Sequence, residues 1–219
     1  MTTKPREAFP ALSTRRLRLR RVERGDAGGL HACFSDPEAM RYWDFPAFET
    51  IAETERLMGW LTKTTSPYDH LAWAITENSG DACIGMVCYH HREARNKRLE
   101  VGYILAPPHH RRGLGTEAVQ ALLRYCVDQL GVHRVQAFVH PDNTASIRLV
   151  ERLGFRCEGG PLTDYWRVGE SYRSAMLYAF LAESGAATPT GTARATPGKP
   201  RRSRKSGRPA GPAIDNRPC

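Results

Sequence analysis

The chain has 219 residues, of which 41% are hydrophobic and 25% charged, the composition of a globular protein with a well-buried core. It has no apolar run near the roughly 18 residues of a membrane span, and it begins without the apolar segment of a secretion signal, so we expect a cytoplasmic protein. The formal net charge of +9 is concentrated near the C-terminal end, and the excess of arginine over lysine is typical of a GC-rich bacterial genome.

The first part of the chain predicts one strand followed by helices. Leucines alternate with arginines over 15–22, which is the pattern of a half-buried strand. Residues 25–36 and 36–43 predict two short helices. Thr50 is placed to cap a third helix, which extends to about residue 63 with its apolar residues on one face.

A run of strands follows these helices. Segments 71–76 and 82–91 are separated by a polar turn and predict a hairpin. Segment 98–105 predicts the next strand, so the strands up to this point form an antiparallel meander. Regular pairing should end at Pro107 and Pro108, because proline cannot donate a hydrogen bond to a neighbouring strand.

The second part alternates helices and strands. A glycine-rich loop opens a helix whose apolar residues recur at helical spacing as far as Gly131, a residue typical of a helix end. Segment 133–140 predicts a strand. Asn143 is placed to cap a further helix that ends at Gly154, and 165–181 predicts two strands joined by a tight turn. The sum is an α/β fold built on one sheet.

Residues 184–219 differ from the rest of the chain. They contain eight Lys or Arg, one acid, a single Ile and no aromatic residue, so they bury too little apolar surface to fold. We therefore divide the chain into a flexible N-terminus (1–11), one folded domain (12–183) and a disordered basic tail (184–219). Weak, salt-dependent contact of such a tail with RNA or the ribosome stays open as an alternative role.

Metal and disulfide sites are not indicated. The six cysteines are scattered and form no Cys-x-x-Cys pair, which is typical of reduced, buried thiols. Two histidine pairs occur, His90-His91 and His109-His110. Adjacent residues of a strand point to opposite faces of a sheet, so such a pair makes a poor metal clamp, and we expect no metal.

The loop "HHRRGLG" before the long helix predicts an anion-binding site. Gly113 and Gly115 let the backbone approach a ligand closely, and the free N–H groups of a helix start favour negative charge. A nucleoside triphosphate site would need Lys-Ser or Lys-Thr after Gly115, and a dinucleotide site a third glycine where Ala118 stands. The pyrophosphate of coenzyme A remains, alongside the alternative of a helix-opening turn without a ligand.

Two central motifs, "LEVGYILAPPHHRRGLGTEA" and "NTASIRLVERLGF", resemble those of the GNAT superfamily of acyl-CoA N-acyltransferases. Together with "STRRLRLRRVERGDAGGL" and "YWRVGESYRSAMLY", they look most like the RimJ/RimL-type ribosomal-protein N-terminal acetyltransferases, over about residues 12–182. The resemblance implies a GNAT-like α/β (α+β) fold. Its mixed, mostly antiparallel twisted sheet of about seven strands would be flanked by helices and splayed between the fourth and fifth strands.

The resemblance also implies that acetyl-CoA is the cosubstrate, and it indicates which residues would contact the coenzyme. The family's loop pattern, Gln/Arg-x-x-Gly-x-Gly/Ala, is met except at its first residue, which is histidine here. The loop would hold the pyrophosphate, mainly through backbone N–H groups; its residues are His110, Arg111, Arg112, Gly113, Leu114, Gly115 and Thr116. Ile104 and Leu105 would pair through backbone groups with the pantetheine arm and the thioester carbonyl. Asn143 would bond the same arm, cap its helix, or do both.

The implied reaction needs a base for the amine and a proton for the thiolate leaving group, without a covalent enzyme intermediate. Glu100 is the candidate base, and the alternative is a glutamate paired with Arg98 or another cation. The tyrosine that many superfamily members use as the acid is replaced here by Val150. Ser146 is the candidate acid instead, or else a small polar residue that touches the coenzyme.

The sequence leaves the acceptor open. Tyr42, Trp43, Phe45 and Phe48 cluster where this fold commonly builds its acceptor wall, and they are equally explained as core. The branch resemblance favours a protein or peptide N-terminal α-amine. The alternatives are a small-molecule amine, such as a polyamine, amino acid or antibiotic, and a regulator that binds acyl-CoA without catalysis. Either a monomer or a homodimer fits the sequence.

Overall fold

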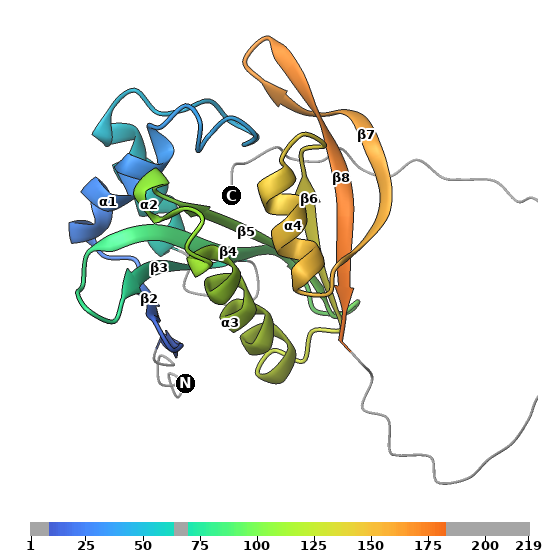
Figure 1. Ribbon diagram of the computed structural model, residues 1–219, viewed down its shortest axis with the longest axis horizontal. Helices are drawn as coiled ribbons and strands as arrows, with labels where there is room; N and C mark the ends of the chain where they lie inside the picture. Colours follow the sequence, from blue (N-terminus) through green and yellow to red (C-terminus); the bar gives the residue numbers. More distant parts are fainter. Residues whose placement is uncertain (1–8, 64–69, 183–219) are drawn as a thin grey trace, which may run out of the picture.

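The computed structural model describes residues 9–63 and 70–182. The predicted basic tail and most of the predicted flexible N-terminus lie outside these ranges, so both stay predictions. The described residues form one eight-stranded sheet with helices on both faces, which confirms the mixed α/β fold (Figure 1). The sheet has one strand more than expected, because a two-residue strand precedes the first predicted one.

The elements follow the predicted alternation of strands and helices. The strands are β1 (Leu12–Ser13), β2 (Leu17–Arg21), β3 (Leu71–Glu77), β4 (Cys83–Glu93), β5 (Arg98–Leu105), β6 (Arg134–Val139), β7 (Arg156–Val168) and β8 (Ser171–Leu181). The helices are α1 (Ala27–Phe34), α2 (Ile51–Lys63), α3 (Leu114–Asp128) and α4 (Thr144–Arg152), with short 3-10 turns η1 (Arg24–Asp26) and η2 (Pro107–His109). No helix within the described ranges has the length and apolar character that crossing a membrane requires.

The sheet order is β1-β2-β3-β4-β5-β6-β8-β7, and every neighbouring pair is antiparallel except β5 and β6. This parallel contact is short, because only Arg98–Glu100 pairs with Arg134–Gln136. β5 continues to Leu105 and β6 to Val139 beyond the paired residues. The two strands therefore diverge, and the splay lies where the resemblance predicts it.

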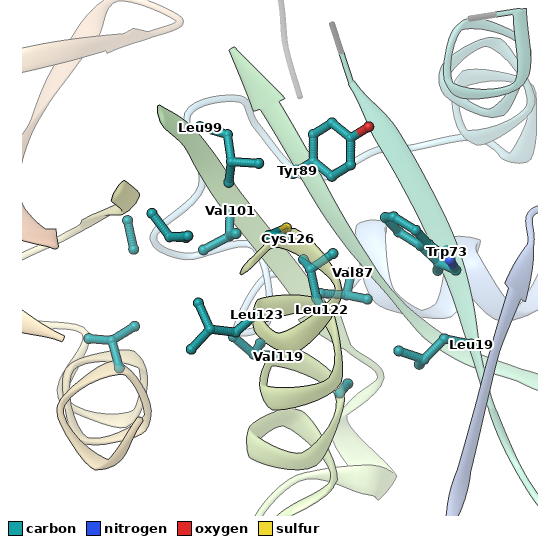
Figure 2. Close-up of a cluster of buried hydrophobic side chains, with 14 of the residues drawn as sticks. Leu19, Trp73, Val87, Tyr89, Leu99, Val101, Val119, Leu122, Leu123 and Cys126 are labelled. Atoms are coloured by element: carbon teal, nitrogen blue, oxygen red, sulfur yellow. The ribbon is translucent and has the colours of Figure 1, made fainter. Parts of the chain in front are cut away.

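One hydrophobic core lies between the sheet and α3. The helix presents Leu122 and Cys126, one turn apart, to the sheet, and both are fully buried. Figure 2 shows these side chains packed against strand residues, among them Trp73 and Val101. Each large apolar side chain buried in this way contributes about 1.5–3 kcal/mol. This packing holds the start of α3, and with it the glycine-rich loop, against the sheet.

A second core covers the opposite face of the sheet, beneath α1 and α2 (Figure 1). Phe34 of α1 and Leu57 of α2 are buried there against Ala74 and Met86. Ile104 of β5 belongs to this core, whereas Leu105 packs on the α3 side. Successive β5 residues thus face opposite layers, as the alternation of a strand requires.

The segment 36–43 forms turns rather than the predicted helix. The Asp36 carboxylate accepts a hydrogen bond from the Ala39 N–H at 2.7 Å, and the Asp36 carbonyl accepts one from the Met40 N–H at 3.0 Å. An aspartate side chain that satisfies nearby N–H groups competes with helix formation. One closed turn therefore replaces the helix, and the chain continues through an aromatic segment.

Strand β7 begins at Arg156, well before the residue at 165 where the sequence predicts it. The sequence does not predict a strand here because it contains Gly160-Pro161, and both residue types usually mark turns. The pairing of β7 with β8 shifts register in this region, which is the signature of bulges. Gly160 has φ +123°, and a Cβ there would lie 2.9 Å from the Ala175 carbonyl oxygen, so the close approach requires glycine. The resulting hairpin projects beyond the rest of the sheet (Figure 1).

Candidate active site

A cleft of about 1860 Å³ lies at the splay between β5 and β6. Its walls come from β5, the loop after it, the starts of α3 and α4, β6, the end of β4, and the segment around residues 36–44. All predicted site residues except Arg112 line this cleft: Glu100, Ile104, Leu105, His110, Arg111, Gly113, Leu114, Gly115, Thr116, Asn143 and Ser146. Residues far apart in the sequence thus converge on one place.

The glycine-rich loop is fastened to the sheet from outside the cleft. Arg16, between β1 and β2, donates from Nη1 to the Arg112 carbonyl at 2.8 Å and from Nε to Glu117 at 2.6 Å. Glu77 at the end of β3 accepts two hydrogen bonds of 2.9 Å from the Arg112 guanidinium. These bonds lower the pKa of Glu77. The Arg112 side chain is therefore an anchor of the loop rather than part of the cleft wall.

His110 ties the same loop to the end of β5. Its ring Nε2 lies 2.7 Å from the Leu105 carbonyl oxygen, and because a carbonyl only accepts, Nε2 carries the proton. The Ala106 N–H bonds to the Ile84 carbonyl at 2.9 Å, so the backbone groups of Leu105 face the other way, towards the splay. Since His110 occupies the Leu105 carbonyl, the N–H is the group that Leu105 offers to a ligand.

Left-handed backbone shapes the loop into a concave turn. Arg111 has φ +58°, and Gly113, the N-cap of α3, has φ +75°. The N–H groups of the first helical turn, from Leu114 to Thr116, have no acceptor inside the helix. The positive end of the helix dipole lies at the same point. The loop and the helix start therefore have the backbone geometry of an anion-binding cradle, and they line the cleft.

Asn143 caps α4, as predicted, because its side-chain oxygen accepts from the Ser146 N–H at 3.1 Å. With the oxygen engaged, its amide N–H groups are what it can offer to a ligand. The Ser146 hydroxyl lies 2.5 Å from the hydroxyl of Tyr103 on β5, which links α4 to β5 across the splay. Burial raises the pKa of Tyr103 to about 12, so this hydroxyl stays protonated at neutral pH. Sequence reasoning missed Tyr103, because a strand tyrosine carries no signal of its partner.

Glu100 is the last residue of β5 that pairs with β6, so its side chain stands where the two strands separate. Arg98 is bonded to Glu93 at 2.6 Å and is therefore not the partner of Glu100. The Glu100 carboxylate instead lies 3.2 Å from Nδ1 of His91, and this hydrogen bond raises the pKa of His91. Burial lowers the pKa of the neighbouring His90 to about 4.

The two histidines point to the same side, and the expectation that they diverge was wrong. The register of β4 against β5 shifts between His90 and Glu93, and His91 has φ +48°. This bulge turns the His91 ring so that its Nδ1 lies 3.2 Å from Nδ1 of His90. The expectation assumed a regular strand, and the irregularity is not visible in the sequence.

The aromatic residues after α1 take both roles that the sequence left open, and Trp43 takes both at once, because its ring also packs on Phe34 with centroids 5.5 Å apart. Tyr42 and Trp43 line the cleft. Phe45 and Phe48 pack on Phe34, with ring centroids 6.0 and 5.6 Å apart, and belong to the core beneath α1. Tyr42 packs on His140, just after β6, with ring centroids 4.9 Å apart. The Trp43 carbonyl accepts a hydrogen bond from Arg173 of β8, so Tyr42 and Trp43 lie on the β6–β8 side of the cleft.

Three carboxylates line the cleft close in sequence to Tyr42 and Trp43. They belong to Asp36, Glu38 and Asp44. Burial raises the pKa of Asp44, which the nearby positive charge of Arg173 partly offsets. The cleft is thus lined by chemically different groups, which are the glycine-rich loop with the start of α3, the acidic and aromatic segment 36–44, and Glu100 on β5.

Comparisons with known proteins agree with this geometry. Residues 16–156 match the family model described as an acetyltransferase (GNAT) domain. The chain belongs to the GNAT family. This GNAT protein is 33% identical over 170 residues to the uncharacterized N-acetyltransferase p20 of Bacillus licheniformis, covering 78% of this chain and 95% of that one. It is 32% identical over 151 residues to the uncharacterized N-acetyltransferase YoaA of Bacillus subtilis, covering 69% and 85%.

Solved structures give the same result for the fold. A GNAT-family acetyltransferase from Bacillus anthracis superimposes with a TM-score of 0.69 at 25% identity, covering 78% of this chain and 98% of that one. The family and its named relatives make this GNAT protein an acetyl-CoA-dependent N-acetyltransferase.

Proposed function

We propose that the protein acetylates the N-terminal α-amine of a protein or peptide by direct attack of the amine on acetyl-CoA, with Glu100 as base and Ser146 as acid. The observation that carries this proposal is the position of Glu100. It stands where β5 and β6 separate, partly exposed, in the same cleft as the anion cradle. A base at the opening of the splay can reach an amine that approaches a thioester held along β5.

The coenzyme binds with its pyrophosphate on the N–H groups from Arg111 to Thr116. Its pantetheine arm runs along the unpaired edge of β5, where the Leu105 N–H donates to it, and Asn143 donates from its amide. The prolines after β5 and the splay keep this strand edge open to an extended ligand. In this arrangement the arm adds to the sheet much as another strand would.

The reaction proceeds in one ternary complex. Glu100 takes a proton from the ammonium or amine of the acceptor, directly or through water, and the nitrogen attacks the thioester carbon. The Leu105 N–H stabilises the oxyanion that forms. When the tetrahedral intermediate collapses, the carbon–sulfur bond breaks and the thiolate receives a proton from Ser146. Tyr103, 2.5 Å from Ser146, replaces that proton.

The size of the cleft favours a large acceptor. Its volume of about 1860 Å³ is about twice the upper range of small-ligand pockets, roughly 300–1,000 Å³. A peptide end beside the coenzyme fits such a space. The RimJ of Mycobacterium smegmatis shares the fold, with a TM-score of 0.69, but at 23% identity it carries no argument about the acceptor.

A polyamine is the second candidate, favoured by the acidic residues that line the cleft. Asp36, Glu38, Asp44 and Glu100 would attract a chain of ammonium groups. The spermidine N(1)-acetyltransferase of Escherichia coli is 25% identical over 164 residues, covering 75% of this chain and 85% of that one. The same carboxylates also suit a single α-ammonium, which a peptide N-terminus carries.

An acceptor panel tests the proposal. Acetyl-CoA is supplied with peptides that begin with Ala, Ser or Met, with spermidine, with free amino acids and with aminoglycosides, and kcat/KM is measured for each. We expect the highest value for a peptide. A higher value for spermidine would replace the first candidate by the second. Coenzyme binding in calorimetry without turnover on any amine would support a regulator and contradict both.

A further inference from the structure

Three potential metal ligands meet in the cleft. Nδ1 of His91 lies 3.2 Å from Nδ1 of His90 and 3.2 Å from Oε2 of Glu100, and the His90 nitrogen lies 3.8 Å from the same oxygen. Each ligand atom therefore lies near the other two, and all three residues line the cleft. Among the described residues, His90, His91 and Glu100 form a group whose ligand atoms all lie within 4.8 Å of one another, close enough to hold one metal ion.

These separations match the geometry of a bound ion. Ligands at about 2.0–2.1 Å from Zn²⁺ stand about 2.8–3.0 Å apart at right-angle positions and about 3.3–3.4 Å apart at tetrahedral positions. Two of the three observed distances lie between these values, and a small rotation of His90 closes the third. The three atoms are already arranged around a common point.

Hydrogen bonding alone explains the cluster poorly. Nδ1 of His91 faces both Nδ1 of His90 and the carboxylate of Glu100, yet a neutral imidazole nitrogen carries at most one proton. One N–H cannot serve two partners well. The left-handed backbone of His91, an uncommon conformation for a residue other than glycine, is what aims the ring at this point.

We propose that His90, His91 and Glu100 form a binding site for Zn²⁺ and that the bound ion blocks acetyl transfer. Two imidazoles and one carboxylate are a donor set that suits this ion, with further positions open to water from the cleft. Asp44 lies near enough to act on His91 electrostatically and adds negative charge to the site. The inhibitory part rests on the proposed function, because the ion would occupy the lone pair that Glu100 needs as a base.

Binding is tested without reference to activity. Untagged full-length protein is treated with a chelator, then titrated with Zn²⁺ in a calorimeter and with Co²⁺ under visible spectroscopy. We expect one ion per chain and d–d bands of nitrogen and oxygen ligands. His91→Asn should weaken Zn²⁺ binding by at least about 10- to 100-fold, since even the loss of a supporting residue costs that much. His91 is 61% exposed, so this variant should fold.

One control variant and one further ligand variant make the binding result decisive. His133→Asn removes an exposed histidine outside the cleft and should leave Zn²⁺ affinity unchanged. A second ligand variant, His90→Gln, should weaken binding as His91→Asn does. Equal affinity in wild type and both ligand variants would overturn the site. A thiolate-to-cobalt charge-transfer band would also overturn it, by pointing to a cysteine such as the exposed Cys157.

Inhibition is tested on the acceptor that gives turnover, with the acetylated product measured by mass spectrometry because Zn²⁺ also binds the coenzyme thiol. Saturating Zn²⁺ should lower the wild-type rate at least tenfold, and a chelator should restore it. The His91→Asn rate, compared with its own metal-free value, should respond much less. Zn²⁺ bound at the histidines without inhibition would contradict the blocking role and Glu100 as base, while leaving the metal site standing.

Discussion

At the scale of single residues, the proposed proton donation by Ser146 depends on Tyr103, a residue of another element. Its hydroxyl lies 2.5 Å from that of Tyr103, whose pKa burial raises to about 12. A serine hydroxyl is a weak acid, so it can protonate a thiolate only if its own proton is replaced as it leaves. Tyr103 is still a stronger acid than serine, so it can supply that proton, and water in the cleft then returns one to Tyr103.

The Tyr103–Ser146 pair predicts a specific double-mutant result. Ser146→Ala should lower kcat by about 100-fold, at the low end of general-acid effects. Tyr103→Phe should lower kcat less, and it should have almost no further effect when Ser146 is already alanine, because the two residues act in series. Independent, multiplying effects in the double variant would contradict the relay. Coenzyme affinity, measured by calorimetry, should change little in either single variant.

Helices and strands could be predicted from the sequence where a single hydrophobic repeat runs through the whole element. The paired leucines of β2 and the 3.6-residue repeat of α3 determine their structures, and both elements are confirmed. The 36–43 turn and the long β7 could not be predicted, because each depends on a local exception. Asp36 closes its own turn, and Gly160 lets a strand continue through a proline that normally ends one.

Asn143 caps α4, and the coenzyme contact that we propose for it can be separated from this cap by substitution. Asn143→Ala should cost about 1 kcal/mol in unfolding free energy through loss of the helix cap and should also weaken acetyl-CoA binding. Asn143→Asp keeps an N-cap oxygen, so its stability in chemical denaturation should stay near wild type. Its coenzyme affinity should still fall, because a carboxylate has no N–H for the pantetheine arm. Normal coenzyme affinity in both variants would reduce Asn143 to a helix cap.

At the scale of the whole molecule, the candidate active site arises from the divergence of β5 and β6. Motif spacing and family resemblance together identified the residues that line it, from Glu100 to Ser146. They could not identify the His91 bulge, the Tyr103 contact or the His110 anchor. Those features depend on register and on side chains that meet across the fold, and neither is encoded in a short stretch of sequence.

The proposed domain boundary gives a prediction at the same scale. A chain that ends at residue 183 should keep the melting temperature and the peptide acetylation rate of the full chain, because we propose that the folded domain is complete there. Thermal unfolding and kcat/KM on the preferred peptide are the measurements. A lower melting temperature would show that the boundary is wrong.

RNA binding is measured on the same two chains. If the tail has the alternative role, the full chain should bind RNA with a steep dependence on salt and the shortened chain should not. RNA binding that survives the truncation would place it on the folded domain instead.

The central claim, that Glu100 at the opening of the splay is the base, is tested most directly by Glu100→Gln. We expect kcat to fall by about 100-fold or more, with the dissociation constant of acetyl-CoA unchanged in calorimetry. Glu93→Gln, on the neighbouring strand and outside the cleft, is the matched control and should keep its rate. A Glu100→Gln enzyme that works at the wild-type rate at every pH would contradict the account, and another group would have to accept the proton.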